Sequence, residues 1–379
     1  MFKMRITSAL LLGLVLSVPL AGQAVDSLAS FTNATPHKLV ELPAKVAFKK
    51  QPKNIILLIG DGMGVAQLHA AQTANGGALN MGLIKHMGLI DTQSADNYIT
   101  DSAAGGTALA TGQRVNNGVI AQDAEGRPIP SILHLSEQHG KATGLVSTSG
   151  ITHATPASFI AHNISRNNYE AIAADFLKTD IDLFIGGGLE HFTQREDGRD
   201  LSRELEEKGY KVFTSLEAAD KAQNGPMAIF TAEGHNPVYP ERGEMLPKAT
   251  QKALEVLSDH QAGFFIMIEG SQIDWGGHAN STPYIVQETL DFDKAVGVAL
   301  EFAAANGETL VIVTADHETG GMTINGGSDQ ELTVNARYTS ENHTAVMVPV
   351  FAYGPGAENF MGIYKNTDIF EKMKALFKF

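Results

Sequence analysis

The 379-residue chain contains no cysteine, so disulfide bonds and thiolate metal sites are both excluded. It also has few basic residues, with 28 Lys and Arg against 42 Asp and Glu, which gives a formal net charge of −14. This balance argues against nucleic acid as the main partner, because binding to phosphate backbones needs clustered Lys and Arg. Any metal ion must therefore be bound by Asp, Glu, His or hydroxyl oxygens, and an anion site must obtain its positive charge locally, most simply from such ions.

A long apolar stretch is missing as well. The run near the amino terminus extends only from about Ile6 to Val18, which is too short to span a bilayer comfortably. Basic residues precede this run, and small residues ending at Ala24 follow it. The pattern predicts a signal peptide at residues 1–24, cleaved near Ala24, and a periplasmic or secreted protein without a membrane anchor. An uncleaved anchor is the alternative.

No internal repeat, low-complexity tract or Pro-rich linker divides the rest of the chain, which favours one domain at residues 25–379. Apolar, β-branched runs alternate with helical patterns along it. The expected strands, each with the length of a buried parallel strand, are 54–59, 144–147, 183–185, 264–268, 310–314 and 346–353. The expected helices are 131–139, 169–178, 201–208, 248–257 and 284–305. This order predicts an α/β fold, a three-layer sandwich with a mostly parallel central sheet. Residues 25–51 show no firm periodicity and are expected to form an arm along the surface.

Carboxylates and imidazoles follow three of the expected strands directly. They are Asp61 after the first strand, Glu269, Asp274 and His278 after the fourth, and Asp316 and His317 after the fifth. Ligands of open α/β sheets bind beyond the carboxyl ends of the strands, so we expect these side chains to meet at one edge. His343 precedes the sixth expected strand and has to reach that edge from the incoming loop. Each Asp by itself could instead cap a turn or a helix.

Carboxylates packed this closely would repel one another unless cations lay between them. Asp274 and His278, four residues apart, can share one helical face, whereas the adjacent Asp316 and His317 need a turn to point together. Mixed Asp and His ligation suits Zn²⁺, and an all-oxygen set suits Mg²⁺. The sequence therefore predicts a cluster of divalent cations.

The candidate nucleophile is Ser102, in the segment TDSAAGGTA at residues 100–108. Small residues after it allow a helix to begin close to the site, with its free N–H groups facing an anion. No Gly-x-Ser-x-Gly elbow and no His–Asp relay accompany Ser102, so a metal ion would have to activate it. The alternative is that Asp101 or Ser102 only caps that helix.

Six segments resemble the alkaline phosphatase family and occur in the order found there. They are DGMG, TDSAAGGTA, THATPASFIAHNISR, EGSQIDWGGHAN, TADHETGG and ENHTA, and they span about residues 53–354. The resemblance implies the fold of that family with reduced surface insertions, because only about 20 residues separate Gly321 from His343. It also implies hydrolysis of a broad range of phosphate monoesters, two Zn²⁺ and one Mg²⁺ per subunit, and a homodimer.

The resemblance further implies a role for each residue that matches a motif. Asp274, His278 and His343 would bind one zinc; Asp61, Ser102, Asp316 and His317 the second; and Asp61, Thr155 and Glu269 the magnesium. Arg166 would grip two phosphate oxygens with its planar guanidinium, although a solvated surface Arg is the ordinary interpretation of such a residue. We expect Ser102 to attack phosphorus in line, giving a phosphoserine that water then hydrolyses.

Two positions depart from the enterobacterial members of the family. His153 and Trp275 stand where those members have Asp and Lys. His153 either contacts the third metal ion or its water shell, or it only bonds a neighbouring residue. These two departures leave the identity of the third metal open.

Other functions fit the sequence less well. A sulfatase needs a Cys or Ser matured to formylglycine in a different motif. A phosphodiesterase is disfavoured because Arg166 and the third-site residues suit a dianionic monoester. A periplasmic protein that scavenges phosphate or metal would bind without turnover, which an intact nucleophile beside a full ligand set disfavours.

Overall fold

The computed structural model describes residues 29–379. The expected signal peptide at residues 1–24 and its cleavage site lie outside the described residues. Within residues 29–379, no helix is both long enough and apolar enough to cross a membrane. The expected arm is confirmed from residue 29 onward: apart from the short strand β1 (Ser30–Thr32) it is irregular, and His37 Nε2 bonds Asp293 Oδ2 at 2.8 Å.

A ten-stranded sheet forms the centre of the described chain, in the order β15-β3-β14-β9-β2-β8-β4-β5-β7-β6. Its strands are β2 (Asn54–Gly60), β3 (His86–Asp91), β4 (Ala142–Gly150), β5 (Leu183–Gly187), β6 (Lys211–Phe213), β7 (Met227–Phe230), β8 (Phe264–Gly270), β9 (Thr309–Thr314), β14 (Val348–Tyr353) and β15 (Gly362–Lys365). The inner strands β9, β2, β8 and β4 are buried along their whole length. Their nearly continuous apolar runs suit a sheet that is covered on both faces.

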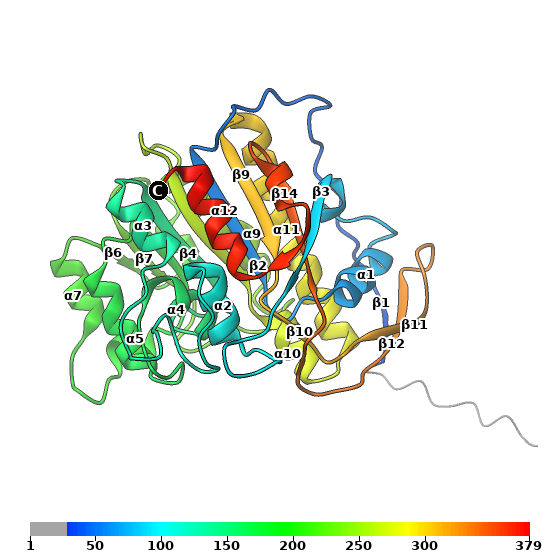
Figure 1. The fold of residues 1–379 in the computed structure, drawn as a ribbon, viewed down its shortest axis with the longest axis horizontal. Coiled ribbons are helices and arrows are strands. Elements are labelled where there is room, and N and C mark those ends of the chain that lie inside the picture. The colour runs from blue at the N-terminus through cyan, green and yellow to red at the C-terminus, as the bar shows by residue number, and fades with distance from the viewer. Residues whose placement is uncertain (1–28) are drawn as a thin grey trace, which may run out of the picture.

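Helices cover both faces of this sheet, as Figure 1 shows. On one face α9 (Met245–Leu257) packs against α11 (Thr282–Asn306), and on the other α2 (Ser102–Thr111), α3 (Ile132–Gln138), α4 (Ala154–Ile160) and α12 (Thr367–Phe377) pack together. The remaining helices are α1 (Val65–Ala74), η1 (Met81–Leu83), α5 (Tyr169–Asp175), η2 (Phe176–Lys178), α6 (Glu190–Thr193), α7 (Leu201–Glu207), α8 (Leu216–Ala219), α10 (Gln272–His278) and η3 (Ala357–Phe360). The predicted α/β sandwich with a mostly parallel sheet is therefore confirmed.

The direction of the sixth expected strand is a correction. The sequence predicts a parallel strand at residues 346–353, but β14 runs antiparallel to both of its neighbours, β9 and β3. A parallel strand needs a crossover to the far edge of the sheet, and no helix lies between β9 and β14 to provide one. Residues 315–347, which connect β9 to β14, stay at the edge where β9 ends. They form the strands β10 (Glu318–Thr319), β11 (Thr323–Ser328), β12 (Thr333–Arg337) and β13 (His343–Thr344). The amino end of β14 therefore lies at the edge where the parallel strands end.

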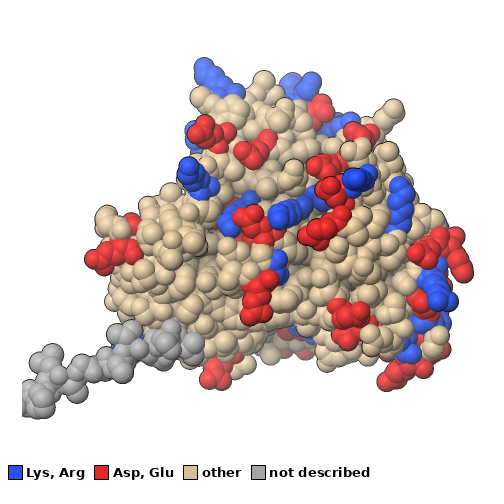
Figure 2. Space-filling model, turned by 180° about the vertical axis from the view of Figure 1, so that it is seen from behind, with Lys and Arg blue, Asp and Glu red and all other residues tan. Residues whose placement is uncertain are grey.

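The surface is consistent with the acidic composition. On the face seen in Figure 2, Lys and Arg side chains lie among Asp and Glu, and no purely basic area is visible there. This face therefore offers no tract of positive charge for a nucleic-acid backbone.

Candidate active site

The carboxyl ends of β2, β8 and β9 lie side by side, and the residues that leave them form one cluster. Asp61 follows β2, and its N–H donates to Gly270 O at the end of β8 at 3.1 Å. Gly62 adopts a φ of +74°, and a Cβ at this position would lie 2.7 Å from Asp274 Cα. Only glycine therefore lets the turn after β2 lie this close to α10.

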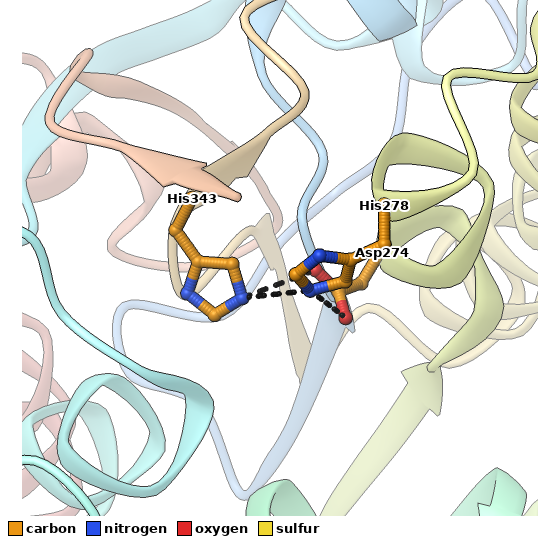
Figure 3. Close-up of side chains that lie close together, drawn as sticks. All are labelled: Asp274, His278 and His343. Carbon is orange, nitrogen blue, oxygen red and sulfur yellow. Dashed lines mark hydrogen bonds and ion pairs between the residues drawn. The ribbon is translucent and has the colours of Figure 1, made fainter. Parts of the chain in front are cut away.

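Asp274, His278 and His343 form the first group of ligand atoms (Figure 3). His278 Nε2 lies 3.4 Å from Asp274 Oδ2, and His343 Nε2 lies 3.4 Å from Asp274 Oδ1 and 3.1 Å from His278 Nε2. The other ring nitrogens are occupied, since His278 Nδ1 bonds Glu341 O at 2.6 Å and His343 Nδ1 bonds Thr100 O at 2.8 Å. These carbonyls place the protons on Nδ1, so both Nε2 lone pairs face the carboxylate, as in a zinc site.

A second group surrounds His317 Nε2. This atom lies 3.2 Å from Ser102 Oγ, 3.3 Å from Asp316 Oδ2 and 3.4 Å from Asp61 Oδ1. Both carboxylate oxygens of Asp61 and Oδ2 of Asp316 are buried without a hydrogen-bond partner. Buried charges of this kind are costly unless they are paired or coordinate a metal, so the orphaned oxygens fit a divalent cation.

A third group lies beside Asp61. Ligand atoms of Asp61, His153 and Glu269 approach within 4.8 Å of one another. Glu269 Oε2 accepts a bond from Ser147 Oγ at 2.6 Å, whereas Glu269 Oε1, Thr155 Oγ1 and His153 Nδ1 are buried without partners. These atoms also fit a cation, and His153 adds a nitrogen to the oxygen set that the sequence predicts.

The electrostatics of the cluster agree with this fit. Burial raises the pKa of the Asp61 carboxyl well above its ordinary value, and the charges of Asp316, Asp274 and Glu269 raise it further. Burial also raises the pKa of Glu269, and that of Asp316 to about 7. Without a cation, the Asp316 carboxyl would keep its proton up to about pH 7, and a bound cation would take the place of that proton.

Ser102 is the first residue of α2. Asp101 caps this helix by accepting from the N–H of Ala104 at 3.0 Å, while Ser102 Oγ lies against His317. The capping alternative therefore holds for Asp101, and Ser102 contacts the cluster directly.

Arg166 lies at the margin of the cluster. Its Nη1 donates to Asp101 Oδ2 at 3.0 Å, and its Nη2 lies 3.3 Å from His153 Nε2. The side chain is only 22% exposed, so Arg166 is not a freely solvated surface residue. Trp275, which follows Asp274 on α10, meets the His153 ring edge-on with centroids 6.1 Å apart.

Sequence reasoning missed Glu318, whose carboxylate connects the segments that carry His317 and His343. This side chain is buried, accepts from Gln67 Nε2 at 2.6 Å, and also accepts from Thr344 Oγ1. Its position inside TADHETGG, next to His317, is the signal that could have found it. His235, which lies against Trp275 and His153, was missed too, and nothing in its local sequence singles it out.

Comparisons with known proteins agree with this geometry. The alkaline phosphatase family model matches residues 52–337 and 328–379. Alkaline phosphatase 4 of Bacillus subtilis is 33% identical over 436 residues, covering 93% of this chain and 94% of that protein. The structure of the alkaline phosphatase from the Antarctic bacterium TAB5 is 42% identical, with a TM-score of 0.82, and covers 87% of this chain and 99% of that one.

A second solved structure, the cold-active alkaline phosphatase from the psychrophile Shewanella sp., is 32% identical with a TM-score of 0.79, covering 86% of this chain and 99% of that one. Two variants of the TAB5 enzyme, in which a histidine is replaced by Asp or Glu, have Mg bound in the site called M3. The family matches nearly all of the described chain, and the relatives align over most of both lengths. This chain therefore belongs to the alkaline phosphatase family and is a metal-binding phosphomonoesterase.

Proposed function

We propose that the enzyme hydrolyses a broad range of phosphate monoesters through a phosphoserine on Ser102, with two Zn²⁺ and one Mg²⁺ per subunit. The observation that carries this proposal is the position of Ser102 Oγ, 3.2 Å from His317 Nε2 and next to carboxylate oxygens that lack partners. His317 contacts this serine through Nε2, but its Nδ1 lies 3.2 Å from Thr319 Oγ1 and has no carboxylate partner among the described residues. A Ser–His–Asp relay is therefore incomplete, and activation of Ser102 depends on the cluster around it.

The proposed ligands follow the three groups of atoms. Asp274, His278 and His343 would hold one zinc; Asp61, Ser102, Asp316 and His317 the second; and Asp61, Thr155 and Glu269 the magnesium, with His153 close enough to join or replace them. Bound metal ions supply Lewis-acid stabilisation of phosphoryl oxygens and lower the pKa of hydroxyl and water nucleophiles.

The protein's own groups set the geometry of the reaction. The bond between Ser102 Oγ and phosphorus forms as the bond to the alcohol oxygen breaks, and water then cleaves the phosphoserine to release phosphate. Asp101 Oδ2 accepts from Nη1 of Arg166 and His153 Nε2 lies 3.3 Å from its Nη2, which leaves the other N–H donors of the guanidinium for two phosphoryl oxygens. All of these contacts address the phosphoryl group and none addresses the alcohol, which supports a broad substrate range.

We also propose that residues 25–379 form one catalytic domain, exported after cleavage near Ala24 and not anchored to a membrane. The family resemblance supports a homodimer. Two loops also carry exposed apolar residues, namely Tyr98 and Ile99 on one and Val346 and Met347 on the other. The bond between His343 Nδ1 and Thr100 O joins these loops, and exposed apolar residues grouped in this way favour contact with another protein surface. Sedimentation of the mature protein at two concentrations tests the oligomeric state.

Hydrolysis of p-nitrophenyl phosphate at alkaline pH, before and after chelation and with zinc and magnesium restored, tests the metal requirement.

Ser102→Ala tests the nucleophile: turnover should fall by more than about a hundredfold, and acid quenching should trap no phosphoenzyme. Ser258→Ala, on an exposed serine at the end of α9, is the matched control and should behave as the parent. Normal turnover and normal trapping in Ser102→Ala would refute the proposal. A comparison with a diester substrate separates this activity from that of a phosphodiesterase.

A further inference from the structure

The loop between β7 and α9, residues 231–244, lies at the same edge of the sheet as the candidate active site. Strands β7, β5, β4 and β8 are parallel, so all four end at that edge. The loop is held on both sides of His235. Gly188 N–H donates to Gly234 O at 2.6 Å, and Gln272 Nε2 donates to Asn236 O at 2.9 Å. The backbone of this loop therefore presents His235 to the site in a fixed position.

The same loop is anchored more deeply through Arg242. This buried guanidinium donates to Glu288 and Asp291 of α11, with Nη1 at 2.8 Å from Glu288 Oε1 and Nη2 at 2.8 Å from Asp291 Oδ2. Bidentate and bridging contacts of this kind are rigid as well as strong. A loop fixed at both ends can act as a support for its neighbours.

His235 contacts the turn that carries His153. Its Nδ1 accepts from the N–H of Gly150, the last residue of β4, at 2.9 Å, so the neutral ring carries its proton on Nε2. Gly150 O in turn accepts from the N–H of His153 at 2.9 Å, which closes the turn. The His235 ring also meets the rings of His153 and Trp275 edge-on, with centroids 5.5 and 4.9 Å away.

These contacts continue to the phosphate-binding group, because His153 Nε2 lies 3.3 Å from Arg166 Nη2. His235 belongs to none of the three groups of ligand atoms in the described chain, so its contacts are those of a support and not of a ligand. We propose that His235 is a positioning residue that fixes the turn at residues 150–153 and, through His153, the guanidinium of Arg166. This inference rests on the proposed role of Arg166 in phosphate binding.

Three variants test it. His235→Leu keeps the bulk but removes the acceptor, whereas His235→Asn places Oδ1 where Nδ1 accepts the Gly150 N–H. His260→Asn, on an exposed histidine just before β8 at the far edge of the sheet, is the control. Each is loaded with zinc and magnesium, its metal content is measured, and kcat, KM and the inhibition constant of inorganic phosphate are determined.

We expect His235→Leu to raise the phosphate inhibition constant about tenfold, as removal of an orienting partner does in metal enzymes, while both zinc ions are retained. His235→Asn should stay within about threefold of the parent, because the bond to Gly150 is kept. The inference is overturned if His235→Leu binds phosphate normally, or if His235→Asn is as impaired as His235→Leu.

A double-mutant cycle with Arg166→Ala separates this inference from the proposed function. If His235 acts through Arg166, the effect of His235→Leu on phosphate binding disappears in the Arg166→Ala background. Fully additive effects would refute the positioning role and leave the role of Arg166 intact. Unchanged phosphate binding in Arg166→Ala alone would instead refute the role of Arg166, and the inference that rests on it.

Discussion

Asp316→Asn should stabilise the metal-free protein while it removes activity. Asp316 Oδ1 accepts from the N–H groups of Gly62 and His317 at 3.3 and 3.1 Å, and an Asn Oδ1 can keep both bonds. Asp316 Oδ2 has no hydrogen-bond partner and lies 3.3 Å from His317 Nε2, to which an Asn amide could donate. The variant therefore loses little from the folded state except a buried negative charge.

The magnitude follows from the pKa of this carboxyl. Burial, with the charge of Asp274, raises it from 3.8 to about 7. The carboxyl thus keeps its proton up to about pH 7 in the native state but loses it near pH 3.8 in the unfolded state. As the pH rises between these two values, ionisation stabilises only the unfolded state. The cost to the native state is roughly 2 kcal/mol at pH 5 and roughly 4 kcal/mol at pH 8. Asn carries no such cost.

Urea unfolding in the presence of EDTA at pH 5 and pH 8 measures this difference. The expected result is a variant that is more stable than the parent at both pH values, with the larger gain at pH 8. Asp180→Asn, at a carboxylate that is 91% exposed, is the control and should change little. Saturating zinc should reverse the order, because the parent then gains binding free energy that the variant lacks. If Asp316→Asn is no more stable than the parent at pH 8 in EDTA, the prediction is refuted. Other interactions would then already offset the free-energy cost of burying the Asp316 carboxylate.

Three further predictions concern the supports of the site. Arg166→Ala should raise the phosphate inhibition constant about 10- to 100-fold, through loss of charge-assisted hydrogen bonds, with unchanged metal content; loss of metal would make Arg166 a structural residue. Glu318→Leu, which frees Thr344, should weaken zinc binding about 10- to 100-fold in a chelator competition, and unchanged affinity would contradict this. Arg242→Leu should lower the free energy of unfolding by about 3–5 kcal/mol in urea, because it leaves Glu288 buried without its cation, and a loss below about 1 kcal/mol would contradict it.

The central strands β2, β4, β8 and β9 were predictable because full burial on both faces imposes a continuous apolar run. The run from Asn54 to Gly60 in β2 is one example, and β8 is another. Strands β3, β6, β7 and β15 were not predicted. β6 and β15 are the two edges of the sheet, β3 next to β15 is partly exposed, and β7 has only four residues. The direction of β14 could not be predicted either, because a fully buried run has the same composition in either direction.

Some residues of the candidate site could be predicted from the sequence, and others could not. Ligands gather beyond the carboxyl ends of parallel strands, and this rule alone predicts that Asp61, Asp274 and Asp316 lie together. His343 could be placed only by its motif, and the reversed direction of β14 gives the physical reason for its position. His235 and Glu318 act through bonds to backbone and side chains that are distant in sequence. Such contacts depend on packing, which a single sequence does not reveal.

The spread of the ligands along the chain also bears on the order of folding. In the first ligand group, Asp274 and His278 follow β8 in the middle of the sheet, while His343 is brought to them by β13 and β14, near the end of the chain. The first ligand group cannot assemble until β14 has inserted between β3 and β9, and such distant pairings form slowly. Zinc would therefore consolidate a sheet that already exists and would not nucleate it. A refolding chain should regain its helices and strands well before it regains turnover.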